Sequence, residues 1–426
     1  MRLLLVADTY PPSRISGALQ MRDLARALAA QGHRPLVLTP ATGASATSLE
    51  CDDGVQVLRV RAPRTKDVPY WRRTLAELAL PWFLLRGLRR SALADEAWEG
   101  VVWYSPSIFL GPVARAVKRH HRCRGYLIVR DLFPDWAVDA GVMRKGGVPY
   151  RLFKAIERYQ YRQADVIGVQ TPSNAPLVAR DAPAATRIEV LHNWLSPPPV
   201  VGVAAVGAVS AGVGATAASA AATVDAAAAI DAAADAVVVA LHHLEGRTNF
   251  VYAGNMGVAQ DMDAFVDLAR RMRERTDVGF VFVGRGSETA RLKMAAQGLP
   301  NLRVLDEVDP ADLPGLLARC HVGIVALHPA HNTHNIPGKL LTYLHAGLPV
   351  LARVNPNNDL VALVEQERVG RVVAGDDAMQ LHAHALALAD DPALRDAMGR
   401  SGRALALRMF SPESAARDVV AALHPP

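Results

Sequence analysis

The chain has 426 residues and a mass of 45.7 kDa, two to three times a typical domain of about 150 residues, so a single small binding module is excluded. It is 50% hydrophobic and 21% charged, as expected of a globular protein. The formal net charge of +6 favours partners that carry phosphate or an anionic lipid surface. Nucleic acid is disfavoured, because the basic residues form no long stripe interleaved with aromatic side chains.

Apolar runs in the sequence are short. None approaches the roughly 20 apolar residues that span a bilayer, and the first run, residues 3–6, is too short for the core of a signal peptide. The three cysteines are scattered and lack metal-ligand spacing, which fits a reducing compartment. These features predict a cytoplasmic protein.

The first segment has the pattern of a β-α-β unit. The apolar run 3–6 leads into a proline-bearing loop, after which Met21, Leu24 and Leu28 recur at spacings of three and four, as on the buried side of a helix. A second strand is predicted over residues 36–38. The same alternation continues along the chain, with further strands predicted at 101–104, 126–129, 166–169, 250–253, 278–283, 322–326 and 350–352.

This alternation predicts an α/β fold with two Rossmann-like domains. The predicted segments are an N-terminal domain over residues 1–195, a low-complexity linker or insertion over 196–247, a C-terminal domain over 248–408, and a C-terminal helix over 409–426 that crosses back to the first domain.

Residues 200–240 consist almost entirely of Ala, Val and Gly. Such a tract lacks the large side chains that offset ordering entropy, so a disordered linker is favoured. A surface alanine helix is one alternative. A membrane span is another, although three aspartates within the tract argue against it.

Glycines occupy equivalent first turns of the two halves. Ligands of doubly wound sheets bind beyond the C-terminal ends of the strands, where helix N-termini attract anions. Gly17 lies at this position in the first half, and Gly254 and Gly257 lie there in the second. Each glycine alone is also typical of an ordinary turn, but the shared placement favours a phosphate-bearing ligand.

A lysine, Lys339, lies in the first turn of a predicted helix over residues 338–346. A cation there opposes the helix dipole at a cost of a few tenths of a kcal/mol unless an anion binds. We therefore predict that Lys339 binds a diphosphate, rather than being a solvated surface lysine. Arg285, directly after the strand 278–283, is a second candidate, with an ordinary loop arginine as the alternative.

Two carboxylates, Asp131 and Asp135, follow the strand 126–129. A carboxylate at such a position can accept a proton from a bound sugar or stabilise positive charge on it. Helix capping and pairing with Arg130 are the alternatives.

Three histidines, His328, His331 and His334, are spaced three residues apart. Their loop lacks a carboxylate or cysteine ligand, so a sugar-binding loop is favoured over a metal site.

Residues 71–90 combine an apolar stripe with arginines predicted on the other face, and Pro81 is expected to break or kink the helix. This composition suits the interface of an anionic bilayer, with packing against the N-terminal domain as the alternative. The stripe comprises Trp71, Leu75, Leu78, Trp82 and Leu85.

The motifs, in this order and spacing, resemble the retaining glycosyltransferases of family 4, which have the GT-B fold of two facing Rossmann-like domains with an interdomain cleft. The branch that assembles bacterial surface polysaccharides, in particular the N-acetyl-L-fucosamine transferases, is the most similar. The resemblance rests on Tyr10-Pro11-Pro12 with Gly17, Leu191-His192-Asn193-Trp194, Gly254-Asn255-Met256-Gly257, Gly284-Arg285-Gly286-Ser287-Glu288, Pro337-Gly338-Lys339-Leu340 and Phe410-Ser411.

The resemblance implies a metal-independent hexosyltransferase without a cofactor. It would move a sugar, with retention, from a UDP-sugar to a lipid-linked saccharide in O-antigen, capsule or exopolysaccharide biosynthesis, at the inner face of the cytoplasmic membrane. The C-terminal domain would bind the donor and the N-terminal domain the acceptor. A sugar-nucleotide epimerase and a donor-binding pseudoenzyme that acts as a partner subunit are the alternatives.

The resemblance implies that Asp131 and Asp135 of this sequence are the catalytic residues. Donor binding falls on Gly17, Gly254, Asn255, Gly257, Arg285, His334, Asn335, Lys339 and Thr342.

The chain also departs from the family pattern. Two frequent glutamates are replaced by His334 and Thr342, and the usual diphosphate-gripping arginine and lysine by Asn255 and Gln260. A frequent histidine is replaced by Arg130. The diphosphate is then expected to depend on Lys339, on Arg285 and on the backbone amides of residues 255–257, with the Thr342 hydroxyl near the ribose.

Overall fold

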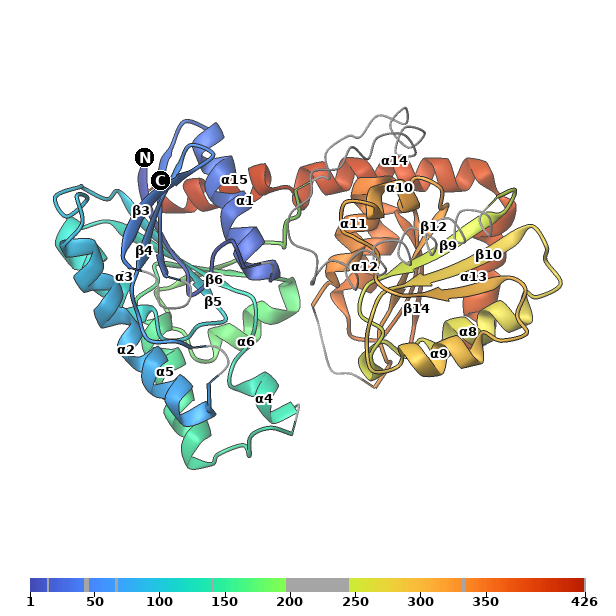
Figure 1. Cartoon of the computed structure of the whole chain (residues 1–426), viewed down its shortest axis with the longest axis horizontal. Helices are drawn as coiled ribbons and strands as arrows, with labels where there is room; N and C mark the ends of the chain where they lie inside the picture. Colours follow the sequence, from blue (N-terminus) through green and yellow to red (C-terminus); the bar gives the residue numbers. More distant parts are fainter. Residues whose placement is uncertain are drawn as a thin grey trace, which may run out of the picture. The chain divides into compact units, whose positions relative to one another are not determined.

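The computed structural model describes residues 1–13, 15–41, 46–65, 68–139, 141–196, 245–330 and 335–424. The tract predicted to be a disordered linker lies outside the described residues. The chain forms two compact units (Figure 1). Unit 1 comprises Met1–Ser196 and Met409–Pro426, and unit 2 comprises Pro197–Arg408.

Unit 1 is built on an eight-stranded sheet in the order β3-β4-β2-β1-β5-β6-β7-β8. All neighbouring strands are parallel except β3 and β4, which are antiparallel. The strands are β1 (Arg2–Val6), β2 (Arg34–Pro40), β3 (Ser48–Asp52), β4 (Val55–Val60), β5 (Gly100–Ser105), β6 (Arg124–Val129), β7 (Val166–Val169) and β8 (Arg187–Val190).

Helices cover both faces of this sheet. Side chains alternate along β1, so Leu3 and Leu5 enter one core while Leu4 and Val6 enter the other. The first core contains α1 (Ser16–Ala30) and α15 (Pro412–Leu423), and the second contains α2 (Tyr70–Arg89), α3 (Gly111–His121) and α5 (Val148–Tyr161). Shorter elements are α4 (Asp135–Asp139), η1 (Pro172–Asn174) and α6 (Ala175–Ala179).

The structure corrects one part of the prediction for the helix around Pro81, namely that the proline breaks it. Helix α2 runs unbroken from Tyr70 to Arg89 with Pro81 inside it. Proline removes one backbone hydrogen bond from a helix, but here Leu80 and Leu84, on either side of it, are buried against the sheet. Tertiary packing therefore outweighs the local cost.

Unit 2 is built on a six-stranded parallel sheet in the order β11-β10-β9-β12-β13-β14. The strands are β9 (Thr248–Ala253), β10 (Val278–Val283), β11 (Leu302–Leu305), β12 (Val322–Ala326), β13 (Val350–Val354) and β14 (Gly370–Ala374). The helices are η3 (Val258–Gln260), α8 (Asp263–Arg271), α9 (Thr289–Ala295), α10 (Leu313–Leu317), α11 (Gly338–Ala346), α12 (Asp359–Glu367), α13 (Ala378–Asp390) and α14 (Pro392–Met409).

Both sheets confirm the predicted α/β architecture, and both have a topological switch point. The chain order reverses between β1 and β5 in unit 1, and between β9 and β12 in unit 2. Ligands of doubly wound sheets bind beyond the strand ends at this point. Gly17 follows β1, Gly254 follows β9, and Lys339 follows β12, so these predicted site residues lie on switch-point connections.

The end of the chain belongs to unit 1. Ser411 is the N-cap of α15, and its hydroxyl oxygen accepts a hydrogen bond from the Ser414 amide at 3.1 Å. Helix α15 then packs against α1. Among the described residues, no helix combines the length and hydrophobicity needed to cross a bilayer.

A buried glycine in β12 sets how closely α11 approaches the sheet. A Cβ at Gly323 would overlap the ring of Tyr343, which is fully buried on α11. We expect Gly323→Ala to lower the free energy of unfolding by about 1–3 kcal/mol through overpacking, measured by urea denaturation. Gly315→Ala is the matched control, because a Cβ there meets nothing within 4 Å. Equal stability of the two variants would contradict the packing argument.

Candidate functional site

Two turns of unit 2 pack backbone against backbone at the C-terminal edge of its sheet. The first, residues 254–257, follows β9, and the second, residues 284–286, follows β10. The Gly254 amide donates to the Val283 carbonyl at 2.8 Å, and the Met256 amide donates to the Arg285 carbonyl at 2.8 Å. A Cβ at Gly284, which has a φ of +149°, would collide with the Gly254 carbonyl oxygen. This contact therefore requires glycine at 284.

Lys339 lies over the first of these turns. Its Nζ is 4.9 Å from the centroid of the buried Tyr252 ring. A Cβ at Gly254 would lie 2.8 Å from Lys339 Cε, so a larger residue would displace the lysine. The position of α11 is fixed one turn further on, where the Tyr343 hydroxyl accepts a hydrogen bond from the Ala253 amide at 2.9 Å.

The charge of Lys339 is poorly compensated in the free protein. Burial lowers its pKa to about 8, because desolvation disfavours the ammonium form. Within the described part of the chain its ammonium forms no salt bridge with a carboxylate. The N-terminus of α11 adds positive partial charge beside it. A bound anion would relieve both costs, so the geometry favours the predicted anion-binding role over a solvated lysine.

The other predicted donor residues of α11 and its entry loop differ in how they are held. Thr342, three residues after Lys339, is half-buried. The Asn335 carbonyl accepts a hydrogen bond from the Asn358 side chain at 3.4 Å. His334 lies outside the described residues.

Two of the three backbone amides of residues 255–257, which were expected to bind the diphosphate, are used within the protein. The Gly257 amide donates to Gln260 Oε1 at 3.0 Å, and the Asn255 side-chain amide donates to the same oxygen at 3.1 Å. The Met256 amide is bonded to Arg285, as described above. Gln260 therefore holds this turn closed, which the sequence pattern did not indicate.

The Arg285 side chain lies at the surface and pairs with a carboxylate of unit 2. Its side chain is 81% exposed, and its Nε lies 3.3 Å from Glu307 Oε2. Exposed ion pairs of this kind contribute little to holding a side chain in place. The geometry thus fits the ordinary loop arginine as well as it fits a second anion contact.

In unit 1, Gly17 permits a close contact within the protein. A Cβ at this position would lie 3.1 Å from Tyr104 Cε1. The Tyr104 hydroxyl donates to Gln20 Oε1 at 2.7 Å, which joins β5 to the first turns of α1. Packing between the switch-point strand and α1 is therefore sufficient to account for this glycine.

The two predicted catalytic carboxylates have different surroundings. Asp135, the first residue of α4, accepts hydrogen bonds from Tyr150 at 2.8 Å and from Lys154 at 2.7 Å. Asp131 is solvent-accessible, and among the described residues its carboxylate has no hydrogen-bond partner. Desolvation by the surrounding protein raises the pKa of Asp131, partly offset by the charge of Arg130. Asp131 is therefore the carboxylate left available to a ligand.

Arg130 forms no salt bridge with Asp131, although its charge acts on that carboxylate. Its guanidinium is buried and donates to the carbonyls of Leu191 at 2.7 Å and His192 at 3.2 Å. It also lies 4.5 Å from the centroid of the Trp194 ring. The alternative in which Arg130 forms an ion pair with Asp131 is therefore wrong, because backbone carbonyls and an aromatic face take up the cation.

The described residues contain no group of three His, Cys, Asp or Glu side chains arranged to hold a metal ion. His328 Nδ1 accepts a hydrogen bond from the Ala330 amide at 3.1 Å. His331 and His334 lie outside the described residues.

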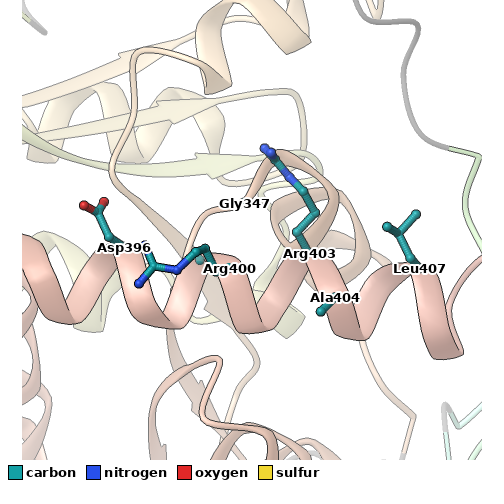
Figure 2. Close-up of a pocket in the computed structure, with 7 residues that line it drawn as sticks. Gly347, Asp396, Arg400, Arg403, Ala404 and Leu407 are labelled. Atoms are coloured by element: carbon teal, nitrogen blue, oxygen red, sulfur yellow. The ribbon is translucent and has the colours of Figure 1, made fainter.

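A hollow of about 440 Å³ lies along α14, at the opposite end of α11 from Lys339 (Figure 2). Arg403 reaches from α14 to the Ala346 carbonyl at 3.2 Å, where α11 ends. This arginine caps the negative end of the helix dipole. The hollow is therefore separate from the predicted donor site.

Two family models match the chain in its two Rossmann-like units. Residues 17–194 match the model described as a Glycosyl transferase 4-like domain, and residues 247–391 match the one described as Glycosyl transferases group 1. The sucrose-phosphate synthase of Thermosynechococcus elongatus has a similar structure, with a TM-score of 0.67 and 15% identity over 99% of this chain and 98% of that one. Together the two models cover most of the chain, so the chain belongs to the glycosyltransferases.

Another solved GT-B structure is similar over almost the whole chain. HepE from Anabaena, determined in complex with UDP-glucose, has a TM-score of 0.61 and 12% identity, covering 99% of each chain. At this identity the likeness establishes the fold alone. It confirms the predicted GT-B fold with two α/β domains.

Two bacterial relatives extend the comparison. WbjE of Pseudomonas aeruginosa, described as a glycosyltransferase, is 22% identical over 57% of this chain, and the match spans about half (54%) of WbjE. WcaI of Escherichia coli K12, described as a colanic acid biosynthesis glycosyl transferase, is 24% identical over 88% of this chain and 91% of its own length. Neither relative favours the epimerase or the partner-subunit alternative.

Because the Lys339 ammonium is partly desolvated, the stability of the free protein should depend on pH. Its pKa is about 8 in the folded protein against an ordinary 10.5, so between these values the folded state binds fewer protons and stability rises with pH. We expect Lys339→Met to stabilise the free protein at neutral pH by about 1–2 kcal/mol, and this gain to shrink as the pH rises above about 8.

Urea denaturation across this pH range measures the effect, with Lys293→Met as the control, because Lys293 is an exposed lysine paired with Asp306. A stability gain that does not change with pH would contradict the buried charge at Lys339.

Proposed function

We propose that this protein is a retaining, metal-independent hexosyltransferase that moves a sugar from a UDP-sugar to a lipid-linked saccharide in bacterial surface polysaccharide biosynthesis. The observation that carries the proposal is the half-buried, uncompensated Lys339 ammonium at the N-terminus of α11, on a switch-point connection of unit 2. The description of WcaI as a colanic acid biosynthesis enzyme supports the polysaccharide assignment. The UDP-glucose bound in the HepE complex supports a UDP-sugar as the donor class.

Lys339 and the helix that carries it would stabilise the leaving diphosphate. As the bond between the sugar and the diphosphate breaks, negative charge grows on the diphosphate oxygens. A desolvated ammonium and the positive end of the α11 dipole interact with that charge more strongly than water does. The Thr342 hydroxyl, one turn along the same helix, is the proposed contact for the ribose. No metal ion is required for this stabilisation.

Asp131 is the proposed carboxylate at the sugar. Positive charge develops on the sugar ring as the leaving group departs, and a nearby carboxylate stabilises it or orients a hydroxyl. Asp131 suits this role because its carboxylate remains unpaired among the described residues, whereas Asp135 is bound by Lys154 and Tyr150. We assign Asp135 to holding the short segment that follows Asp131.

The proposed acceptor is attached to a lipid, so the enzyme would act at the inner face of the cytoplasmic membrane as a peripheral protein. The basic net charge of +6 suits a phosphate-rich, anionic surface.

Donor binding provides the first test. We expect Lys339→Ala to weaken UDP binding by roughly 10- to 100-fold in a calorimetric titration, because a desolvated charge-assisted contact is lost. In the wild type, UDP affinity should fall as the pH rises above about 8, since deprotonation removes the cation. Lys293→Ala is the control. Unchanged UDP affinity in Lys339→Ala would remove Lys339 from the donor site.

The reaction itself provides the second test. UDP-sugars are screened with lipid-linked acceptors, and the product is detected by its mass. With the active donor, Asp131→Asn should lower turnover by about 100-fold or more while leaving UDP affinity within about twofold, because the lost charge acts in the transition state. Asp135→Asn, which keeps Asp131 intact, is the comparison. Equal losses in both variants would contradict the separate roles assigned to the two carboxylates.

A further inference from the structure

Helix α2 is fixed to the sheet of unit 1 by one side. Ala76, Leu80, Leu84 and Leu88 are buried on this side. A Cβ at Gly87 would lie 2.5 Å from Val60 Cγ2 on β4, so the helix and the strand are already in close contact. The helix has no room to turn its other side inwards.

That other side is apolar and faces solvent. Trp71 is 62% exposed, Leu75 58%, Leu78 47% and Trp82 56%. Their spacing of four, three and four residues places them in one stripe, about 16 Å long at 1.5 Å per residue. The sequence identified these four residues as part of a stripe, but the packing of unit 1 depends on other α2 residues, namely the buried set above and Leu85 at the end of the predicted stripe. The alternative that the stripe packs against its own domain holds only for Leu85, which is half-buried against the core, and is wrong for the other four residues.

Arginines accompany the stripe instead of lying opposite to it. The Cζ of Arg72 is 5.0 Å from the Trp71 ring centroid, and the Cζ of Arg86 is 5.0 Å from the Trp82 ring centroid. A guanidinium thus lies over the ring of each of the two tryptophans of the stripe. Helix α2 contains a single acidic residue, Glu77, which is paired with Arg73 at 2.9 Å. The exposed side is therefore both apolar and cationic.

A second group of exposed apolar side chains lies near α5. These residues are Trp136 at 49%, Val142 at 68%, Val148 at 82% and Leu152 at 50% exposure. Helix α5 packs into the same core as α2, so both helices lie on one face of the sheet, as Figure 1 also shows. Exposed cations interrupt this group as well, at Arg144, Lys145 and Arg151.

We propose that the solvent-facing stripe of α2, assisted by the exposed residues near α5, binds the surface of an anionic phospholipid bilayer. Tryptophan and leucine insert their apolar bodies at the level of the headgroups, and arginines contact the phosphates. Because the one carboxylate of α2 is paired with an arginine, the exposed side is positively charged, which complements the negative charge of such a surface. This inference deepens the proposed function by naming the surface that would bring the enzyme to its lipid-linked acceptor.

Vesicle sedimentation tests the inference with the full chain. We expect binding to vesicles of equal parts phosphatidylglycerol and phosphatidylcholine, and much weaker binding to phosphatidylcholine alone. The double variant Trp71→Ser/Trp82→Ser should bind at least about tenfold more weakly, because two aromatic anchors are lost. Arg72→Gln/Arg86→Gln should lose about fivefold per arginine at about 0.1 M salt, and the effect should nearly vanish at about 1 M, where charges are screened.

The matched control is Met294→Ser/Met379→Ser, which removes two similarly exposed apolar side chains from unit 2. Wild-type binding in this control is expected. The inference is overturned if the wild type does not bind anionic vesicles, or if the tryptophan variant binds as tightly as the control. It is also overturned if sedimentation velocity shows a dimer that the tryptophan variant abolishes, because the stripe would then cover a second copy of the chain.

A UDP titration distinguishes failure of the membrane-binding inference from failure of the proposed transferase function. The tryptophan variant should bind UDP as the wild type does, since Trp71 and Trp82 lie in unit 1 and Lys339 lies in unit 2. Loss of vesicle binding with intact UDP binding supports the membrane surface. Vesicle binding by a wild-type protein that fails to bind UDP would leave the surface standing and remove the proposed transferase.

Discussion

The cost of holding the Lys339 ammonium at the start of α11 is the constraint on which the candidate donor site depends. Desolvation and the helix dipole both disfavour a cation there, and the face of Tyr252 compensates only in part. The fold keeps the lysine in place because Tyr343, one turn later, is buried against Gly323 and bonded to the end of β9. In the region that the structure describes, the positive charge is thus organised before any ligand arrives, as electrostatic preorganisation requires.

Much of the fold could be predicted from short apolar runs and their spacing. The strands β5, β6, β7, β9, β10 and β12, and the helices α11 and α15, lie within a few residues of their predicted positions. Strands β3, β4, β8 and β14 were not predicted. In β4 the buried Val55 and Val57 alternate with an exposed Gln56, so the strand lacks the continuous apolar run that marks a fully buried strand. Pairing with β2 stabilises β4, and this pairing could not be predicted from the local sequence of β4.

The candidate site was less predictable, because it depends on side chains that meet only after folding. Lys339 could be proposed from its position in one helix turn, which is local information. The difference between Asp131 and Asp135 could not, since it arises from Lys154, which reaches back from the middle of α5. Likewise, both sides of α2 are rich in leucine, so the pattern alone could not decide which side meets the sheet. The contact of Gly87 with Val60 decides it.

The return of the chain to unit 1 has a consequence for biosynthesis. Ala416, Val419 and Leu423 of α15 are buried in the same core as Leu3, Leu5 and the inner side of α1. The Leu195 amide also donates to the Phe410 carbonyl at 2.9 Å, so the end of the N-terminal segment is bonded to a residue made more than 200 positions later. On the ribosome, the face of the first sheet that α1 covers therefore remains incomplete until α15 emerges. The unit that is synthesised first is completed last.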